Sequence, residues 1–168
     1  MKYLIDAVID TNNKLIIIGD GEMYNILQKK INLCKNKNIK ILKNIGDNQL
    51  PYFIKLSKCL ILPSHLRSEA FGFSLVEGLM FGKPLISCDI KTGTSFINKN
   101  NSTGFVVKPR SSLSLKLAIN KINSKKFNSK KISKNCKYRF NKYFTQEKMI
   151  FKYLKLYKSL FKSHDRIN

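Results

Sequence analysis

The chain has 168 residues, a length that fits one ordinary domain. Apolar residues make up 43% of it, which is enough for a hydrophobic core and excludes a largely disordered protein. The formal net charge is +22, of which residues 85–168 carry +17, so partners that bear phosphate groups (nucleic acid, anionic lipid or phosphorylated substrates) have to be considered.

Short runs of branched aliphatic residues alternate along the chain with stretches at helical spacing. The runs that predict buried strands are residues 15–18, 39–42, 59–62, 84–87 and 104–107. The stretches between them that predict helices are residues 23–31, 50–56 and 113–122. Alternation at roughly twenty-residue intervals indicates right-handed crossovers and a parallel sheet covered on both faces. The predicted fold class is therefore α/β, a Rossmann-like parallel sheet flanked by helices.

The two ends of the chain depart from this alternation. The chain opens in a helix-like segment, residues 4–9, with no strand before it, and it becomes helical and basic beyond residue 108. The last segment, residues 145–162, places its apolar side chains on one stripe and its lysines away from it. Because no linker or repeat interrupts the sequence, we expect one domain, residues 1–168, with residues 127–168 as a C-terminal helical extension.

Residues 64–78 carry the most chemical information. They begin at the carboxyl end of a predicted strand, where ligands bind in open α/β sheets. A helix is expected to begin near Ser74 and to stop by Gly82, so a glycine-containing loop leads into a helix N-terminus that suits a phosphate. Glu69 then lies in the loop and Glu77 about one turn inside the helix. Two carboxylates in one crevice suit sugar hydroxyls, because each accepts two O–H bonds.

Structural roles remain open for parts of this region. Ser74 and Glu77 have the spacing of a capping box, in which the glutamate accepts from the Ser74 backbone N–H, and spacing alone favours this interpretation. Glu69 also fits a solvated loop carboxylate. The earlier segment Gly19-Asp20-Gly21 is not a dinucleotide fingerprint, because position 24 is tyrosine, and a tight strand–helix turn is favoured there.

The two glutamates enclose Phe71-Gly72-Phe73 and are followed by Gly82-Lys83-Pro84. This order resembles the motif of the retaining nucleotide-sugar glycosyltransferases of family 4, which have the two-lobed GT-B fold, and specifically their C-terminal donor-binding domain. Further segments that match in order are residues 15–21, 60–64 and 103–107. The resemblance spans residues 4–161. Residues 67–72 and 80–84 are similar to mannosyl- and rhamnosyltransferases of bacterial O-antigen assembly.

The resemblance implies roles for individual residues. Glu69 would contact the transferred sugar as the catalytic residue, and Glu77 would bind the donor ribose, a role that replaces the capping interpretation. The residues whose backbone would approach the diphosphate and sugar are Ala70, Phe71, Gly72 and Phe73. The implied reaction moves a hexose, with retention, from a nucleotide-diphosphate sugar to a glycan or lipid-linked acceptor in surface polysaccharide (lipopolysaccharide) synthesis. No metal or other cofactor is implied, since N–H groups and cations would stabilise the leaving diphosphate.

The same resemblance implies parts that this chain would lack. The family's donor lobe opens with a strand and a loop whose Arg and Lys bind the diphosphate, and the acceptor-binding N-terminal lobe comes before it. Without the first strand, two strand edges at the centre of the sheet would be left unpaired. We therefore expect a fragment that is inactive alone, folds poorly or forms an oligomer, and needs a separate N-terminal lobe. A regulator that binds nucleotide sugar without turnover is a further interpretation.

The charge supports an alternative, a basic membrane- or nucleic-acid-binding module without catalysis. A bias toward Lys, Asn and Ile explains the charge equally well. The aromatic residues of 138–144 lie among apolar helix positions rather than on a stacking platform, and no nucleic-acid-binding motif is present, so no nucleic acid partner is expected. The last helix is basic enough to lie on an anionic membrane surface. Four widely spaced cysteines and no leader indicate a reduced cytoplasmic protein. The basic last helix adds the expectation of peripheral contact with the inner membrane.

Overall fold

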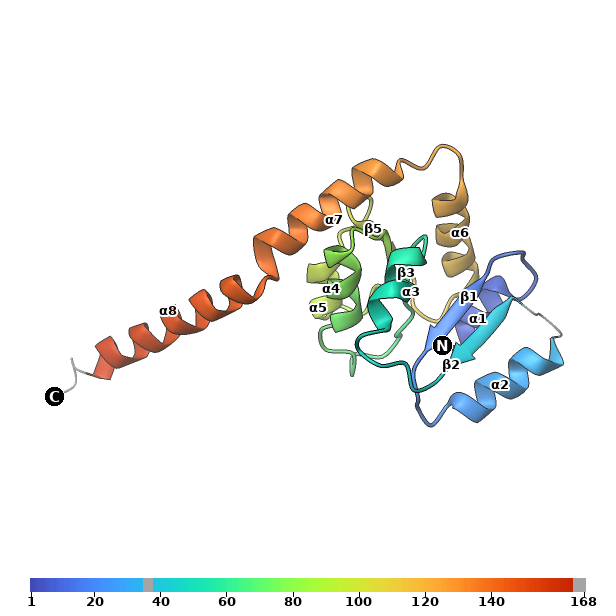
Figure 1. The fold of residues 1–168 in the computed structure, drawn as a ribbon, viewed down its shortest axis with the longest axis horizontal. Coiled ribbons are helices and arrows are strands. Elements are labelled where there is room, and N and C mark those ends of the chain that lie inside the picture. The colour runs from blue at the N-terminus through green and yellow to red at the C-terminus, as the bar shows by residue number, and fades with distance from the viewer. Residues whose placement is uncertain (35–37, 165–168) are drawn as a thin grey trace.

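The computed structural model describes residues 1–34 and 38–164, and its helices and strands alternate in the order that the sequence predicts (Figure 1). In chain order the elements are α1 (Lys2–Val8), β1 (Leu15–Ile18), α2 (Tyr24–Leu33), β2 (Ile39–Leu42), α3 (Leu50–Leu56), β3 (Leu60–Leu62), α4 (Phe73–Met80), β4 (Leu85–Cys88), α5 (Gly93–Ile97), β5 (Gly104–Val107), α6 (Ser112–Asn123), α7 (Ser129–Tyr143) and α8 (Gln146–His164).

All strand pairings in the described residues are parallel, and they form two sheets. One sheet pairs β1 with β2, with Leu15 opposite Ile39, and the other has the order β3-β4-β5, with Leu60 opposite Leu85. Within the part of the chain that the structure describes, β1 and β3 each pair along one edge only. The prediction of an α/β fold with parallel strands flanked by helices is confirmed, with the difference that the sheet is interrupted between β1 and β3.

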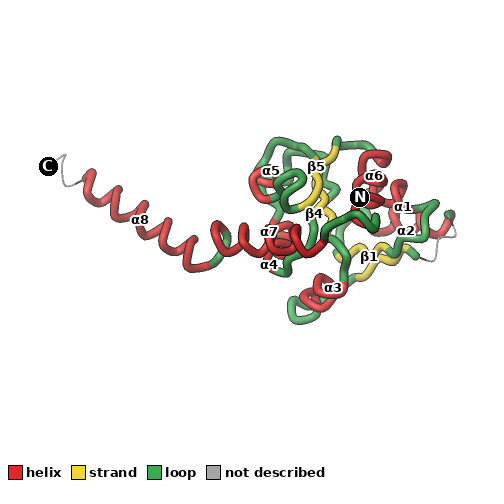
Figure 2. The backbone as a smooth tube through the Cα atoms, turned by 90° about the horizontal axis from the view of Figure 1, so that it is seen from above, coloured by secondary structure: helices red, strands yellow, loops and turns green. Residues whose placement is uncertain are grey.

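A single hydrophobic cluster bridges this interruption. It joins Ile17 of β1 and Ile39 of β2 to Ile86 of β4, and it includes Ile5 of α1 and Leu115 of α6. Helix α1 packs against α6, and both lie at the end of the molecule opposite α8 (Figure 2). The two sheets therefore share one hydrophobic core. Burial of branched aliphatic side chains from both sheets in this core favours folding.

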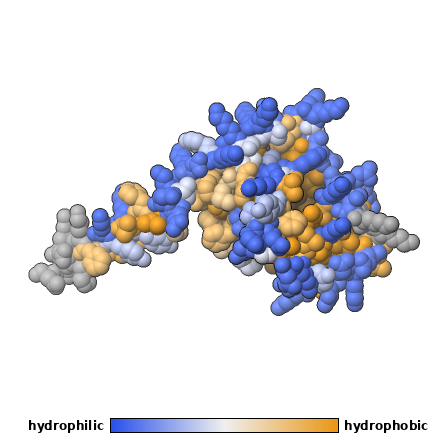
Figure 3. Space-filling model, viewed as in Figure 1, coloured by the Kyte–Doolittle hydropathy of each residue, from blue (hydrophilic) through white to orange (hydrophobic). Residues whose placement is uncertain are grey.

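A second cluster fixes the helices that follow the candidate motif. Leu75 and Leu79 of α4 pack with Leu85 of β4 and with Ile132 and Cys136 of α7, all of them buried. Helix α8 then extends away from this body, and each of its residues from 146 to 161 is exposed. Hydrophobic and hydrophilic surface patches alternate along it in the space-filling view (Figure 3).

Several details differ from the sequence predictions. Strands β3 and β4 each begin one residue later than expected, and the short helix α5 was not among the predicted helices. The expectation that the aromatic residues of 138–144 pack in the core is wrong for Tyr138, which is 64% exposed, whereas Phe140 and Phe144 contact the second cluster. No described helix has the length and apolar character needed to cross a bilayer.

Candidate functional site

Residues 63–72 connect β3 to α4 at the carboxyl edge of the β3-β4-β5 sheet. Helix α4 begins at Phe73, and its N-cap Gly72 has φ +90° and ψ +64°, a left-handed conformation that favours glycine. A Cβ atom at this position would lie 2.9 Å from Leu62 Cδ2 and 3.2 Å from Thr94 Cγ2. Gly72 therefore lets the backbone approach both β3 and α5 and directs the first amides of α4 toward the carboxyl edge.

The capping-box interpretation of Ser74 and Glu77 is wrong. The helix starts at Phe73 with Gly72 as N-cap, and no side-chain hydrogen bond caps it, so Ser74 lies inside the first turn. The reason is that the left-handed glycine closes the preceding loop before the serine is reached. The Glu77 carboxylate is therefore not used to start the helix.

The predicted phosphate loop is held against the loop after β4. The Gly93 N–H donates to the Ala70 carbonyl at 2.8 Å, and a Cβ on Gly93 would lie 2.8 Å from both that carbonyl oxygen and Phe71 Cδ2. Thr94 is buried beneath Gly72, and its Oγ1 lies 3.2 Å from Thr92 Oγ1. The turns that follow β3 and β4 thus form one surface.

Glu69 lies within this loop and is partly buried. The Ser64 hydroxyl donates to Glu69 Oε2 at 3.3 Å, and the Glu69 N–H donates to the Leu66 carbonyl at 3.3 Å. These contacts hold the carboxylate beside the carboxyl end of β3. The aromatic residues on either side of Gly72 have ring centroids 5.2 Å apart, and Phe73 is 75% exposed.

The pKa of Glu77 is affected by a residue from a loop of the other sheet. Partial burial, and to a smaller extent the charge of Asp47, raise the pKa of Glu77 above its ordinary value. Asp47 belongs to the loop between β2 and α3, so loops of both sheets lie near the start of α4. Lys43 directly follows β2, forms an ion pair with Asp20 at 3.2 Å, and lies 3.6 Å from the centre of the Tyr24 ring.

Cations also gather where α1 begins. The Tyr3 and His65 rings meet edge-on at 5.5 Å. Burial, then the N-terminal amine, Arg110 and Lys2, lower the pKa of His65. The start of α1 and the loop after β5 therefore approach the loop after β3.

Two charged residues near the site were not predicted from the sequence, namely Asp47, whose charge acts on Glu77, and Arg110, whose charge acts on His65. Each lies a few residues beyond the carboxyl end of a strand, Asp47 after β2 and Arg110 after β5. Their one sequence signal was this position shortly after a predicted strand, because ligand-binding loops of parallel sheets begin there.

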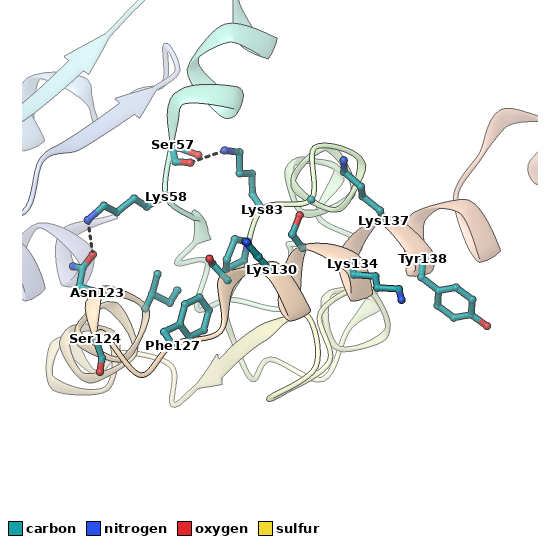
Figure 4. Close-up of a pocket in the computed structure, with 15 residues that line it drawn as sticks. Ser57, Lys58, Lys83, Asn123, Ser124, Phe127, Lys130, Lys134, Lys137 and Tyr138 are labelled. Carbon is teal, nitrogen blue, oxygen red and sulfur yellow. Dashed lines mark hydrogen bonds between the residues drawn. The ribbon is translucent and has the colours of Figure 1, made fainter.

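Neither Glu69 nor Glu77 lines either of two cavities in the described residues. The larger, of about 1000 Å³, lies between the ends of α3 and α6, the turn before β4, and α7 (Figure 4). The smaller, of about 540 Å³, lies at the carboxyl ends of β4 and β5 and includes Ser95. The buried Ser95 hydroxyl has no hydrogen-bond partner among the described residues.

The cysteines and acidic residues show no further chemistry in the described residues. No group of three or more His, Cys, Asp or Glu side chains there is placed to hold a metal ion. All four cysteines are free. Burial raises the pKa of Cys59 to about 11 and that of Cys136 to about 12, so both side chains are neutral thiols packed against apolar neighbours.

Comparison with known sequences identifies the family of this chain. The family model described as glycosyl transferases group 1 matches residues 1–139. An O-antigen chain mannosyltransferase of Escherichia coli is 35% identical over 163 residues, which are 97% of this chain and 44% of that protein. A D-rhamnosyltransferase of Pseudomonas aeruginosa is 35% identical over 145 residues, which are 86% of this chain and 38% of that protein. The chain thus spans less than half the length of these relatives.

Solved structures share the fold. A glycosyltransferase from Rickettsia africae superposes with a TM-score of 0.84 at 25% identity, over 96% of this chain and 44% of that one. The Anabaena protein HepE, solved in complex with UDP, superposes with a TM-score of 0.86 at 20% identity, over 95% of this chain and 45% of that one. These neighbours have the GT-B architecture, which agrees with the predicted fold.

Proposed function

The chain belongs to the group 1 glycosyl transferases, and we propose that it is the donor-binding domain of an enzyme that transfers a hexose from a nucleotide-diphosphate sugar. The acceptor is a glycan or a lipid-linked acceptor in surface polysaccharide synthesis. Relatives at 35% identity named as mannosyl- and rhamnosyltransferases support this choice of sugar class. Because the chain spans 44% of the first relative, the proposal assigns acceptor binding to a separate N-terminal lobe.

The observation that carries the proposal is the convergence at the carboxyl edge. Gly72 presents the first amides of α4 there, and these amides, with the positive end of the helix dipole, would bind the donor diphosphate. Cations of the neighbouring loops, including Arg110, would neutralise its charge. The Anabaena protein HepE, which shares the fold, was also solved in complex with UDP-glucose, and this supports a nucleotide sugar as ligand.

The two glutamates would recognise hydroxyl groups. Glu77 would accept hydrogen bonds from the donor ribose, and Glu69, held by Ser64, would contact the transferred sugar. The transfer would proceed with retention of configuration. It would need no metal, because backbone amides and cations would stabilise the diphosphate as it leaves.

Calorimetry with GDP, UDP and ADP tests the donor assignment. We expect at least one of the three to bind, and Glu77→Ala to weaken it roughly tenfold to a hundredfold, because a lost hydrogen bond to a charged group costs about 1.5–3 kcal/mol. Glu147→Ala, on the exposed helix α8, is the matched control and should bind as the parent does. A folded chain that binds none of the three, or equal binding by Glu77→Ala, would contradict the proposal.

The alternative function, a membrane-binding module, is favoured by α8 alone. Its residues from 146 to 161 are exposed, and they combine apolar side chains such as Leu154 and Leu160 with Lys148, Lys152, Lys155 and Lys158. A helix of this composition binds anionic lipid surfaces through burial of its apolar face and attraction of its lysines. Peripheral contact with the inner membrane is therefore part of the proposal, and it is compatible with glycosyl transfer to a lipid-linked acceptor.

A further inference from the structure

The larger cavity lies at the opposite end of the strands from the candidate donor site. Ser57 and Lys58 come just before β3, and residues 82–84 come just before β4, so the cavity opens at the amino ends of these strands. The end of α6 and the first half of α7 complete its wall (Figure 4). It is a hollow open to solvent rather than an enclosed cavity, and its volume of about 1000 Å³ is sufficient for a small ligand. Nothing in the proposed transfer reaction uses it.

Its lining is strongly basic. Five lysines line the cavity (Lys58, Lys83, Lys130, Lys134 and Lys137), and no lining residue is acidic. Two of them are engaged, since the Lys83 ammonium donates to the Lys55 and Ser57 carbonyls at 2.6 and 2.8 Å, and the Lys58 ammonium donates to Asn123 Oδ1 at 3.4 Å. For the other three, all from α7, the described residues supply no hydrogen-bond or ion-pair partner.

The core fixes where these three exposed lysines lie on α7, although their side chains extend in different directions in Figure 4. Lys130, Lys134 and Lys137 follow a spacing of four and three residues, which places them along one face of α7. Ile132 and Cys136, on another face, are buried in the second cluster, so the helix cannot rotate the lysines away from the cavity. Like charges at this spacing repel one another, and the sequence offers no acidic residue between Asp89 and Glu147 to offset them.

Polar groups beside the lysines add to an anion-binding surface. Ser129 and Ser133 line the cavity, and Ser129 is the first residue of α7, at the positive end of its dipole. Gly82 lies close against the helix, because a Cβ there would come within 2.5 Å of Ser133 Oγ and 3.0 Å of Lys137 Cε. The backbone before β4 and the lysine face of α7 therefore form one wall, while Phe127 supplies an apolar part of the lining.

We propose that this cavity is a second ligand site, which binds a phosphate-bearing ligand through Lys130, Lys134 and Lys137. A phosphate group accepts several charge-assisted hydrogen bonds at once, and its negative charge would offset the repulsion among these lysines. The ligand is a free diphosphate or the phosphate of a lipid headgroup, which present the same chemistry. The site does not depend on the proposed function, because it lies away from Glu69 and Glu77.

The test uses the full chain and a triple variant, Lys130→Gln, Lys134→Gln and Lys137→Gln, whose fold is checked by circular dichroism. The matched control makes the same replacement at Lys148, Lys152 and Lys155 of α8, which have the same spacing and the same charge but lie outside the cavity. Inorganic pyrophosphate is titrated by calorimetry at low salt, and vesicles containing phosphatidylglycerol are tested by co-sedimentation. We expect the cavity variant to lose about tenfold or more in affinity for one of these probes, and the control variant to keep it.

The outcomes separate the source of the ligand and the two sites. Loss of pyrophosphate binding in the cavity variant alone identifies a free phosphorylated ligand, and loss of vesicle binding in that variant alone identifies a lipid headgroup. Equal losses in both triple variants would show attraction to net charge only and would overturn the proposal, as would unchanged binding by the cavity variant. The cavity variant should keep the binding of GDP, UDP or ADP that the parent shows, because those ligands are assigned to the candidate donor site, so failure of the donor assignment leaves this result intact.

Discussion

Gly72 is the residue on which the shape of the candidate donor site depends. Its φ of +90° is available to glycine at little cost, whereas an L residue loses about 1–2 kcal/mol in the left-handed region. Its open side is filled by Leu62 and Thr94, which leave no room for a methyl group. Gly72→Ala should therefore lower the free energy of unfolding by about 2 kcal/mol or more, measured by urea denaturation.

Gly21→Ala provides the matched control for this substitution. Gly21 follows β1, its backbone is not in the left-handed region, and no atom lies within 4 Å of the position of a Cβ. We expect its free energy of unfolding to stay within about 0.5 kcal/mol of the parent. A Gly72→Ala protein as stable as Gly21→Ala would show that the loop can adopt another turn, and the fixed direction of the α4 amides would then be incorrect.

Because the pKa of Glu77 is raised, the free energy of unfolding is expected to depend on the protonation of this candidate site residue. Burial and Asp47 both disfavour the carboxylate, so the folded protein binds this proton more tightly than the unfolded chain does. The stability cost is absent below the ordinary value of 4.5, where both states are protonated, and grows to its full size above the raised pKa. Glu77→Gln should therefore raise the Tm at pH 7 and leave it nearly unchanged in acid below that value.

Thermal unfolding monitored by circular dichroism from acid to slightly alkaline pH measures this difference. Asp47→Asn should reproduce a smaller part of the increase, because the charge of Asp47 is the lesser cause of the raised pKa. Glu147→Gln, whose carboxylate lies on exposed α8, controls for the loss of a negative charge from a basic protein. If the Tm difference between Glu77→Gln and the parent is largest in acid, its pH dependence is the opposite of the expected one, and this explanation is excluded.

The strands were predictable because a strand that is buried on both faces has a short, continuous run of apolar residues. Residues 15–18 and 39–42 form β1 and β2 with the expected bounds, since branched aliphatic residues fit a covered parallel sheet. The start of α4 was less predictable, because Gly72 and Ser74 are competing N-cap signals two residues apart. The contact of Gly72 with Thr94, which is distant in sequence, selects between them.

Short helix α5 and its surroundings depend on tertiary contacts that a local pattern does not contain. Asn98, which follows α5, donates to Ser87 Oγ at 2.9 Å and accepts from Thr103 Oγ1 at 2.9 Å, within the core. The candidate site has the same property. Glu69 and Glu77 belong to one local motif, and the motif was enough to predict them. Asp47 lies in another loop, and only the tertiary fold places its charge near Glu77.

Helix α8 shows a further limit of periodic patterns. The spacing of its apolar residues predicted an amphipathic helix, and residues 146–164 form one. Periodicity identifies the apolar face of the helix but not what that face contacts, and the face is exposed at Tyr153 and Tyr157. The pattern therefore predicts the helix and its apolar face without predicting what that face contacts.

At the scale of the whole molecule, the interruption between β1 and β3 raises the question of whether the two sheets unfold together. No backbone pairing joins them in the described residues, so their coupling depends on side chains. Ile5 of α1 is fully buried in the cluster that contains Ile17 of β1 and Ile86 of β4. Because close-packed side chains transmit the loss of a neighbour, this cluster should make the two sheets a single cooperative unit.

Ile5→Ala tests the coupling. Removal of this buried side chain should cost about 2–5 kcal/mol, and native-state hydrogen exchange should show amides of β1 and β4 losing protection by the same amount. Ile16→Ala is the control, because Ile16 lies on β1 but is 50% exposed and should change protection little. A loss confined to β1 and β2 would mean that the sheets are independent units joined only by the chain. Equal losses would mean that the two sheets unfold as one cooperative unit. A candidate donor site built from loops of both sheets requires that they stay together in this way.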